Sequence, residues 1–153
     1  MLYAPGTLRA AGLRTGREVE VFELTTAEPP AKLRLTPART DLRADGQDLG
    51  FVTLEVVDAG GRVVPQAELP VRVALEGPAV IAGIGSGDLT SRESYRANPH
   101  RLYQGRGIVV IRTDARAGRI TLTATATGTG PAEIALTSSP TSCIGRRQTH
   151  DIR

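Results

Sequence analysis

The stretch that decides the fold is Leu35–Asp58, LTPARTDLRADGQDLGFVTLEVVD, followed directly by residues 59–77, AGGRVVPQAELPVRVALEG. The pattern predicts a strand that ends near a proline, a turn, a long strand of alternating apolar and polar residues, a Gly-Gly turn and a further strand. The same stretch contains no nucleophile motif, cluster of metal ligands or phosphate-binding loop. We therefore expect a β-sandwich module that packs, spaces or binds, with any chemistry carried elsewhere.

The whole central region, residues 28–138, continues this pattern. The expected strands are Lys32–Thr36, Gly50–Asp58, Val71–Glu76, Ala79–Ile84, Gly107–Thr113, Arg119–Thr127 and Ala132–Thr137, with a shorter one near Asp41–Ala44. About seven short strands, separated by glycine-containing turns and without a helical period, are typical of an all-β, antiparallel immunoglobulin-like sandwich. In the second strand residues 52, 54 and 56 should face the core, and in Ile120–Ala126 the threonines should point outward.

The two ends of the chain differ from this sandwich. Residues 1–27 predict a β-hairpin with strands Thr7–Leu13 and Glu18–Thr25, and Glu28-Pro29-Pro30 predicts a short stiff linker. A lone hairpin is marginally stable in water, so we expect it to dock on the sandwich or to pair edge to edge with another copy. Residues 139–153 lack periodicity, and we expect a disordered tail.

Composition limits the function further. The chain has no Trp, two Phe and three Tyr, so its core must be built from aliphatic residues. The net charge of +3 comes from scattered arginines without a basic stripe, which argues against nucleic-acid binding. Cys143 is the only cysteine, which leaves no disulfide framework or thiolate metal site, and no apolar run is long enough to span a membrane. We expect no metal and no cofactor, and the compartment stays open between cytoplasm, periplasm and exterior.

Function could concentrate in the connection Gly85–Arg106, because loops of this length are often binding or docking elements. Its candidate contact residues are Asp88, Arg92, Glu93, Tyr95, Asn98, His100 and Tyr103. An aromatic face with Asp, Asn and Arg side chains suits a sugar, so carbohydrate contact is one hypothesis. Packing against other domains is the second. The third is a solvated loop held by local arginine–carboxylate pairs, and we favour the last two over sugar binding.

Four other groups of residues give weaker evidence for a functional site. Asp88 and Glu93 do not suit a glycosidase acid/base pair, since neighbouring arginines lower carboxylate pKa values. Asp41, Asp45 and Asp48 could suggest calcium, but aspartates in turns usually bond their own backbone. His100 and His150 have no spaced partners for a zinc site or a triad. Glycines 83, 85 and 87 precede no predicted helix, which argues against a phosphate loop.

Residues 44–88 resemble the C-terminal immunoglobulin-like domain of bacterial glycoside hydrolase family 2 enzymes of β-galactosidase type. The motifs that carry the resemblance are Ala44-Asp45-Gly46 with Asp48, Val57-Asp58-Ala59 with Val64-Pro65, and Gly85-x-Gly87-Asp88. Tyr3-x-Pro5-Gly6-x-Leu8 resembles the last hairpin of the immunoglobulin-like domain that precedes it in those enzymes. Residues 44–77 are also loosely similar to invasin-type repeats. The family often has Asn where Ser86 stands and His where Arg92 stands.

The resemblance implies a parent hydrolase that cleaves terminal sugars on a (β/α)₈ barrel, of which this chain contains no part. It implies a non-catalytic module that braces the barrel or shapes the rim of its cleft, with no catalytic residue of its own. The partners would be the parent's other domains, carbohydrate, or another copy through the hairpin. The alternatives are an invasin-type adhesion or spacer module and a free carbohydrate-binding module, for which five Phe and Tyr residues are few.

Overall fold

The computed structural model describes residues 4–140, and these form strands and loops only. The strands are β1 (Thr7–Arg14), β2 (Arg17–Thr25), β3 (Lys32–Pro37), β4 (Asp41–Arg43), β5 (Leu49–Val57), β6 (Pro70–Glu76), β7 (Ala79–Gly85), β8 (His100–Arg101), β9 (Arg106–Thr113), β10 (Gly118–Ala126) and β11 (Ala132–Ser139). Tyr3, Cys143 and His150 lie outside the described residues, as does most of the predicted tail. No membrane-spanning helix occurs between residues 4 and 140.

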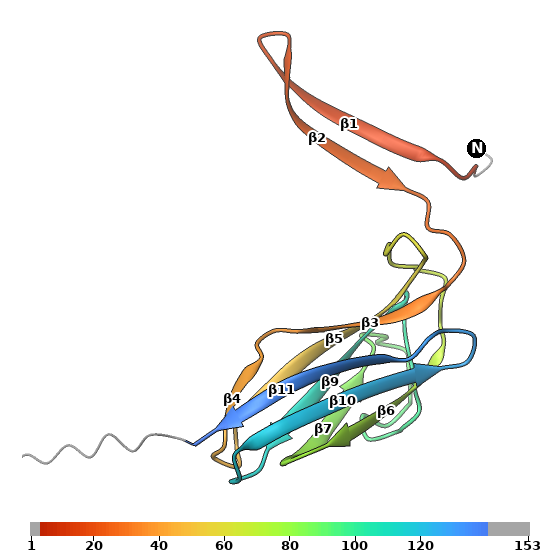
Figure 1. The fold of residues 1–153 in the computed structure, drawn as a ribbon. Coiled ribbons are helices and arrows are strands. Elements are labelled where there is room, and N and C mark those ends of the chain that lie inside the picture. The colour runs from red at the N-terminus through yellow and green to blue at the C-terminus, as the bar shows by residue number, and fades with distance from the viewer. Residues whose placement is uncertain (1–3, 141–153) are drawn as a thin grey trace, which may run out of the picture.

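Two sheets form the sandwich, as Figure 1 shows. One has the strand order β4-β11-β10-β6-β8, and the other has the order β3-β5-β9-β7. All pairs are antiparallel except β11 with β4, where residues 137–139 run parallel to residues 41–43. The all-β immunoglobulin-like fold is confirmed, and each expected strand is present with ends within about two residues. The strand β8 was not expected, and β11 extends to Ser139, one residue into the predicted tail.

The core lies between the sheets and follows the predicted alternation. Val52, Leu54 and Val56 of β5 are fully buried, while Thr53 is exposed and Glu55 half-buried. In β10, Ile120, Leu122 and Ala124 are fully buried, the intervening Thr121 and Thr123 are half-buried, and Thr125 is exposed. Further Leu, Val and Ile side chains complete the cluster without an aromatic residue. Burial of this aliphatic surface supplies the main driving force for folding.

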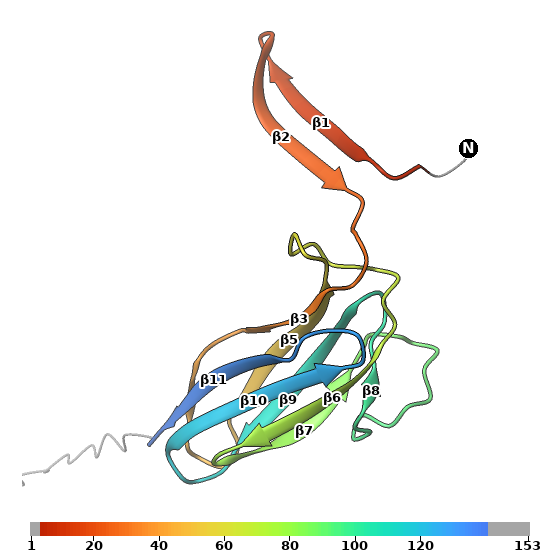
Figure 2. The same ribbon diagram turned by 45° about the vertical axis from the view of Figure 1, so that its right-hand side comes forward.

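The N-terminal hairpin forms a separate two-stranded sheet beyond one end of the sandwich (Figures 1 and 2). Its turn consists of Thr15 and Gly16, both at positive φ, which suits the twist of a tight hairpin. Every residue of β1 and β2 is exposed, so in this structure the hairpin does not dock on the sandwich. Of the two outcomes expected for it, docking is not seen, and edge-to-edge pairing with another copy stays a prediction.

The linker is held where it meets the sandwich. The backbone N–H of Glu28 donates to Oδ2 of Asp58 at 3.1 Å, and the N–H of Ala31 donates to the carbonyl of Val57 at 2.9 Å. Ala27 packs against the core. These contacts with the sandwich therefore restrain the predicted linker in addition to its two prolines.

Candidate contact surface of the β7–β8 loop

The connection between β7 and β9 is less open than its length suggests. The sequence predicted one loop here, but the short strand β8 divides the connection. In β8, Arg101 pairs with Pro70 and His100 pairs with Val71 of β6. Leu102 follows and is buried in the core. A two-residue strand leaves no period in the sequence, so pattern analysis could not detect it. The free part of the connection is residues 86–99, which we call the β7–β8 loop (Figure 2).

Two anchors attach this loop to the sheets. The side chain of Asn98 imitates a neighbouring strand: Nδ2 donates to the carbonyl of Val73 at 2.6 Å, and Oδ1 accepts from its N–H at 2.9 Å. On the opposite sheet, Ile84 of β7 donates its N–H to the carbonyl of Tyr95 at 2.7 Å. The loop is thus held through backbone groups of both edge regions. No arginine–carboxylate pair joins two of its side chains in the part of the chain that the structure describes.

Five of the seven predicted contact residues line one pocket of about 270 Å³. They are Asp88, Arg92, Glu93, Tyr95 and His100, with Ser86, Gly87, Leu89 and Ser91 completing the wall. We call this the Glu93 pocket. Asn98 lies outside it because its amide is occupied by β6, and Tyr103 lies in the next turn along the chain.

His100 forms the floor of the Glu93 pocket. The residue is only 3% exposed, and its Nδ1 is buried without a hydrogen-bond partner. The nearest acidic oxygen, Oε2 of Glu93, lies 3.6 Å from Nδ1 and also accepts the N–H of Arg101 at 3.0 Å. A buried nitrogen without a partner is unusual in a folded protein. His100 lines the pocket, but its Nδ1 is closed off from solvent and from any ligand in this conformation.

Hydrogen bonds within its own turn favour the ionised form of Asp88. Its Oδ1 accepts from the hydroxyl of Thr90 at 2.7 Å and from the backbone N–H of Thr90 at 2.8 Å. These bonds hold the pKa of Asp88 below its ordinary value, the hydroxyl contributing most. A glycosidase general acid needs a raised pKa, so Asp88 does not fit that role. The expected cause of the lowering was arginine, whereas the structure shows Thr90.

Tyr95 dominates the surface beside the pocket. Its side chain is 74% exposed, and its ring lies on Gly85 of β7, where a Cβ would stand 3.5 Å from ring carbons. At that distance the Cβ of an alanine would make ordinary van der Waals contact with the ring. One face of the aromatic ring therefore rests on the sheet edge while the rest stays open to solvent.

Tyr103 belongs to a tight backbone turn. It pairs with Arg106 across a tight turn in which Gln104 and Gly105 both have positive φ. A Cβ at Gly105 would collide with the carbonyl oxygen of Val64, so only glycine fits there. Tyr103 is 37% exposed and does not line the Glu93 pocket.

Sequence reasoning missed two arginines near the loop, Arg96 and Arg112. Both line a second pocket on the other side of Tyr95, between the loop and β7. Arg112 belongs to β9, the strand next to β7, and comes close only because of sheet order. The composition of Gly85–Arg106 contained Arg96, but no sequence signal connects Arg112 with this loop.

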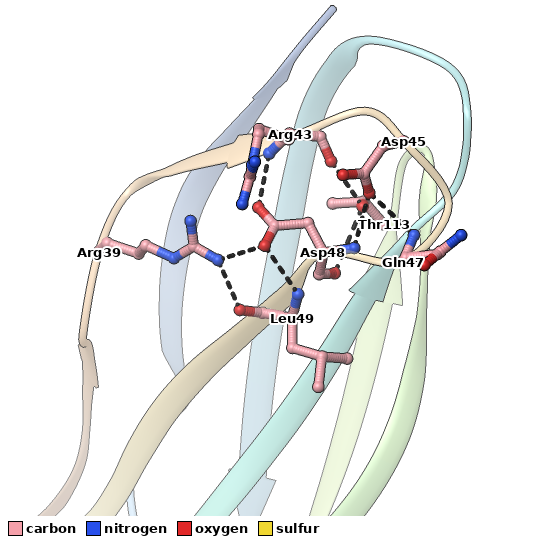
Figure 3. A network of polar contacts seen from close by, with 7 residues as sticks. All are labelled: Arg39, Arg43, Asp45, Gln47, Asp48, Leu49 and Thr113. Atoms are coloured by element: carbon pink, nitrogen blue, oxygen red, sulfur yellow. Dashed lines mark hydrogen bonds and ion pairs between the residues drawn. The ribbon is translucent and has the colours of Figure 1, made fainter. Parts of the chain in front are cut away.

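Two of the three aspartates considered for calcium, Asp45 and Asp48, serve another purpose, which Figure 3 shows. Oδ1 of Asp45 accepts the N–H groups of Gln47 and Asp48 at 2.9 and 2.8 Å, as expected for an aspartate in a turn. Asp48 accepts from Arg39 at 2.6 Å and from the N–H of Arg43 at 2.7 Å. These bonds, Arg39 first, lower the pKa of Asp48. Between residues 4 and 140 no group of three potential ligands is placed to hold a metal ion.

Comparison with known proteins shows the family. The model of the glycoside hydrolase family 2 C-terminal domain 5 matches residues 33–135. β-Galactosidase BoGH2A of Bacteroides ovatus is 39% identical over 126 residues, which cover 82% of this chain and 15% of that protein. The crystal structure of a glycosyl hydrolase family 2 member from Bacteroides cellulosilyticus superposes with a TM-score of 0.87 at 37% identity, covering 91% of this chain and 18% of the other.

The relation to invasin-type repeats is one of fold. The D0-D1 domain of intimin matches 70% of this chain and 48% of its own with a TM-score of 0.52 at 22% identity. The family model and the hydrolase matches cover more of the chain at higher identity, and nothing found favours an adhesion module. This chain belongs to the C-terminal domain 5 family of glycoside hydrolase family 2, as a non-catalytic accessory region of such an enzyme.

Proposed function

We propose that the chain braces the catalytic barrel of a hydrolase acting on O-glycosyl bonds of β-galactoside type, or shapes the rim of its cleft. The relatives it matches include β-galactosidases and a β-glucuronidase, and the chain spans only 12–15% of the length of these relatives. The observation that carries the proposal is the N-terminal hairpin, because it presents an unburied apolar face at the end of a fixed linker.

Strand register separates the two faces of this hairpin. Leu8 lies opposite Leu24 and Ala10 opposite Phe22, which places these four side chains on one face. On the other face Arg9 forms ion pairs with Glu18 at 2.7 Å and Glu23 at 3.5 Å. Leu8, Phe22 and Leu24 are each more than half exposed.

Such a face needs a covering partner in water. We propose that residues 1–27 complete an immunoglobulin-like domain that precedes residues 28–138, and that its body covers Phe22 and Leu24. The bonds from Glu28 and Ala31 to the end of β5 then carry the orientation of that domain to the sandwich. A joint of this kind transmits position between domains, which is what a brace requires.

A domain exchange tests the brace. The region of BoGH2A that aligns with this chain is replaced by this chain's residues, and hydrolysis of a nitrophenyl β-galactoside and the melting temperature are measured. We expect the exchanged enzyme to keep activity and to melt within a few degrees of the original, while deletion of the region lowers both. Full activity and an unchanged melting temperature after deletion would contradict a bracing role.

A control variant separates bracing from general misfolding. Phe22→Asp in the exchanged enzyme should reproduce much of the effect of the deletion, since it places a charge on the apolar face. Val21→Asp on the opposite face of the same strand should leave the enzyme close to the unmodified exchange. Equal effects of the two substitutions would show that the apolar face is not the contact.

Carbohydrate contact at the Glu93 pocket is a second candidate function. The convergence of Asp88, Arg92, Glu93 and Tyr95 around one pocket supports it, because acceptors, donors and an aromatic ring then surround one small hollow. Titration calorimetry of the chain with galactosides tests it. Binding should be lost in Tyr95→Ala and kept in Tyr103→Ala, whose ring lies outside the pocket.

A further inference from the structure

Two pockets meet at Tyr95 and differ in charge. The Glu93 pocket on one side contains the carboxylates of Asp88 and Glu93 together with the guanidinium group of Arg92. The second, of about 320 Å³, is lined by Val80–Ile84 of β7 together with Tyr95, Arg96, Asn98 and Arg112. We call it the Arg112 pocket. It has two guanidinium groups and no carboxylate in its wall.

The two arginines are available to a ligand. Neither guanidinium donates a hydrogen bond or forms an ion pair within the part of the chain that the structure describes; Arg96 uses only its backbone N–H, which donates to Ser94. By contrast, Arg34, Arg39, Arg106 and Arg116 are each paired with a carboxylate. Asn98 does not compete, because its amide is occupied by Val73. The Arg112 pocket thus concentrates unneutralised positive charge beside an exposed ring.

This combination specifies the chemistry of a ligand. Guanidinium groups bind planar carboxylates with two parallel hydrogen bonds, and an exposed tyrosine ring stacks against the C–H face of a sugar. A volume of about 320 Å³ stands at the lower end of ligand pockets, which run from about 300 to 1,000 Å³, and suits a single sugar unit. The edge of β7 adds backbone groups that are not paired with a further strand in the described part of the chain.

We propose that the Arg112 pocket binds a carboxylate-bearing sugar of an acidic oligosaccharide, with Arg112 and Arg96 on the carboxylate and Tyr95 against the ring. The neighbouring sugar of the same chain then reaches the Glu93 pocket, where carboxylates accept from its hydroxyls. This inference rests on the carbohydrate contact proposed above and adds the class of sugar. Its basis is the change across one tyrosine from a pocket of mixed charge to one whose only charged groups are guanidinium groups.

Calorimetry with matched ligands tests the proposal on the 153-residue chain. The probes are a disaccharide of one galacturonate and one galactose unit, a neutral digalactose of the same linkage, and tetraglutamate as an acidic peptide. We expect the galacturonate-containing disaccharide to bind at least about tenfold more tightly than digalactose, and tetraglutamate to bind no better than the neutral sugar. In Arg112→Gln and in Arg96→Gln the preference for the acidic sugar should fall to less than about threefold while digalactose binding is unchanged.

Controls make the result specific to the pocket. Arg119→Gln removes an exposed arginine from β10 in the other sheet and should change nothing, which separates local contact from overall charge. Melting curves confirm that each variant is folded. Tyr95→Ala should weaken both sugars, because the ring serves both pockets.

The possible outcomes separate the acidic-sugar inference from the carbohydrate contact on which it rests. Equal binding of both sugars, or a preference that survives both arginine substitutions, would overturn the acidic-sugar inference and leave carbohydrate contact standing. Binding of tetraglutamate alone would overturn both in favour of a protein contact. Absence of saturable binding of either sugar at concentrations of about 10 mM, above the range of specific recognition, would likewise overturn both.

Discussion

The carboxylate of Asp58 holds the backbone of Glu28: Oδ2 accepts the Glu28 N–H at 3.1 Å, and Oδ1 accepts the N–H of Arg62 at 2.8 Å. Asp58 has no exposed surface and lies directly after β5. One side chain therefore joins the linker, the end of a core strand and the turn that follows. The residue belongs to the motif Val57-Asp58-Ala59, so a feature of the sequence resemblance has a definite mechanical role.

Acid should weaken the fold through this carboxylate. The N–H groups of Arg62 and Glu28 hold the pKa of Asp58 below its ordinary value, and bonds from Arg39 do the same for Asp48. A carboxylate with a lowered folded pKa stabilises the protein fully above its unfolded pKa, about 4, and loses that contribution as the pH falls through the folded value.

Urea unfolding from neutral pH down to strongly acidic pH measures the effect. The original chain should lose stability below about pH 4, and Asp58→Asn should be less stable at neutral pH but lose less on acidification. Asp41→Asn, which changes an exposed carboxylate, is the control and should follow the original curve. Parallel curves for the original and Asp58→Asn would contradict the assignment.

Two glycines at positive φ should differ sharply on substitution. Gly105 has φ +70 and faces the carbonyl of Val64, whereas Gly128 has φ +81 and open space for 4 Å around the position that a Cβ would take. Gly128→Ala should cost about 1–2 kcal/mol, the usual penalty of the left-handed region. Gly105→Ala should cost more, since it adds a collision to the same backbone strain. Chemical denaturation compares them, and equal costs would show that the turn near Val64 relaxes freely.

The hairpin should drive association of the isolated chain. Its apolar face, with Phe22 63% and Leu24 56% exposed, is uncovered when no preceding domain is present. We expect sedimentation velocity to show a concentration-dependent dimer that Phe22→Asp reduces. Val21→Asp, on the face that carries the Arg9 ion pairs, should leave the dimer in place. A monomer at every concentration, with a protease-sensitive N-terminus, would instead show a hairpin that needs its own domain to be ordered.

Asn98 should control the order of the β7–β8 loop. Asn98→Ala leaves the N–H and the carbonyl of Val73 without the partners seen at 2.9 and 2.6 Å, and unsatisfied groups of this kind cost about 1–3 kcal/mol each when buried. Hydrogen exchange should then rise across residues 86–99. Arg92→Ala, an exposed residue of the same loop, is the control and should leave exchange at Val73 unchanged.

Local sequence determined most of the sandwich. In β5 and β10 the period of two places one set of residues on each face, and burial of the apolar set leaves a single register in which that set is covered. The hairpin followed from the same alternation around Thr15-Gly16, and Asp45 followed from turn chemistry within three residues of itself. These features depend on neighbours along the chain, which a sequence displays directly.

Tertiary structure alone decided the candidate site. Three features depend on which strands become neighbours across sheet edges. They are the pairing of β8 with β6, the bonds of Asn98 to Val73, and the position of Arg112 beside Tyr95. The composition of the loop predicted five residues of the Glu93 pocket but could not separate them from Asn98, whose amide serves the backbone. Periodicity reports which side of a strand is buried; it carries no information on what a distant strand brings to the edge, because that position is set by the packing of the whole sandwich.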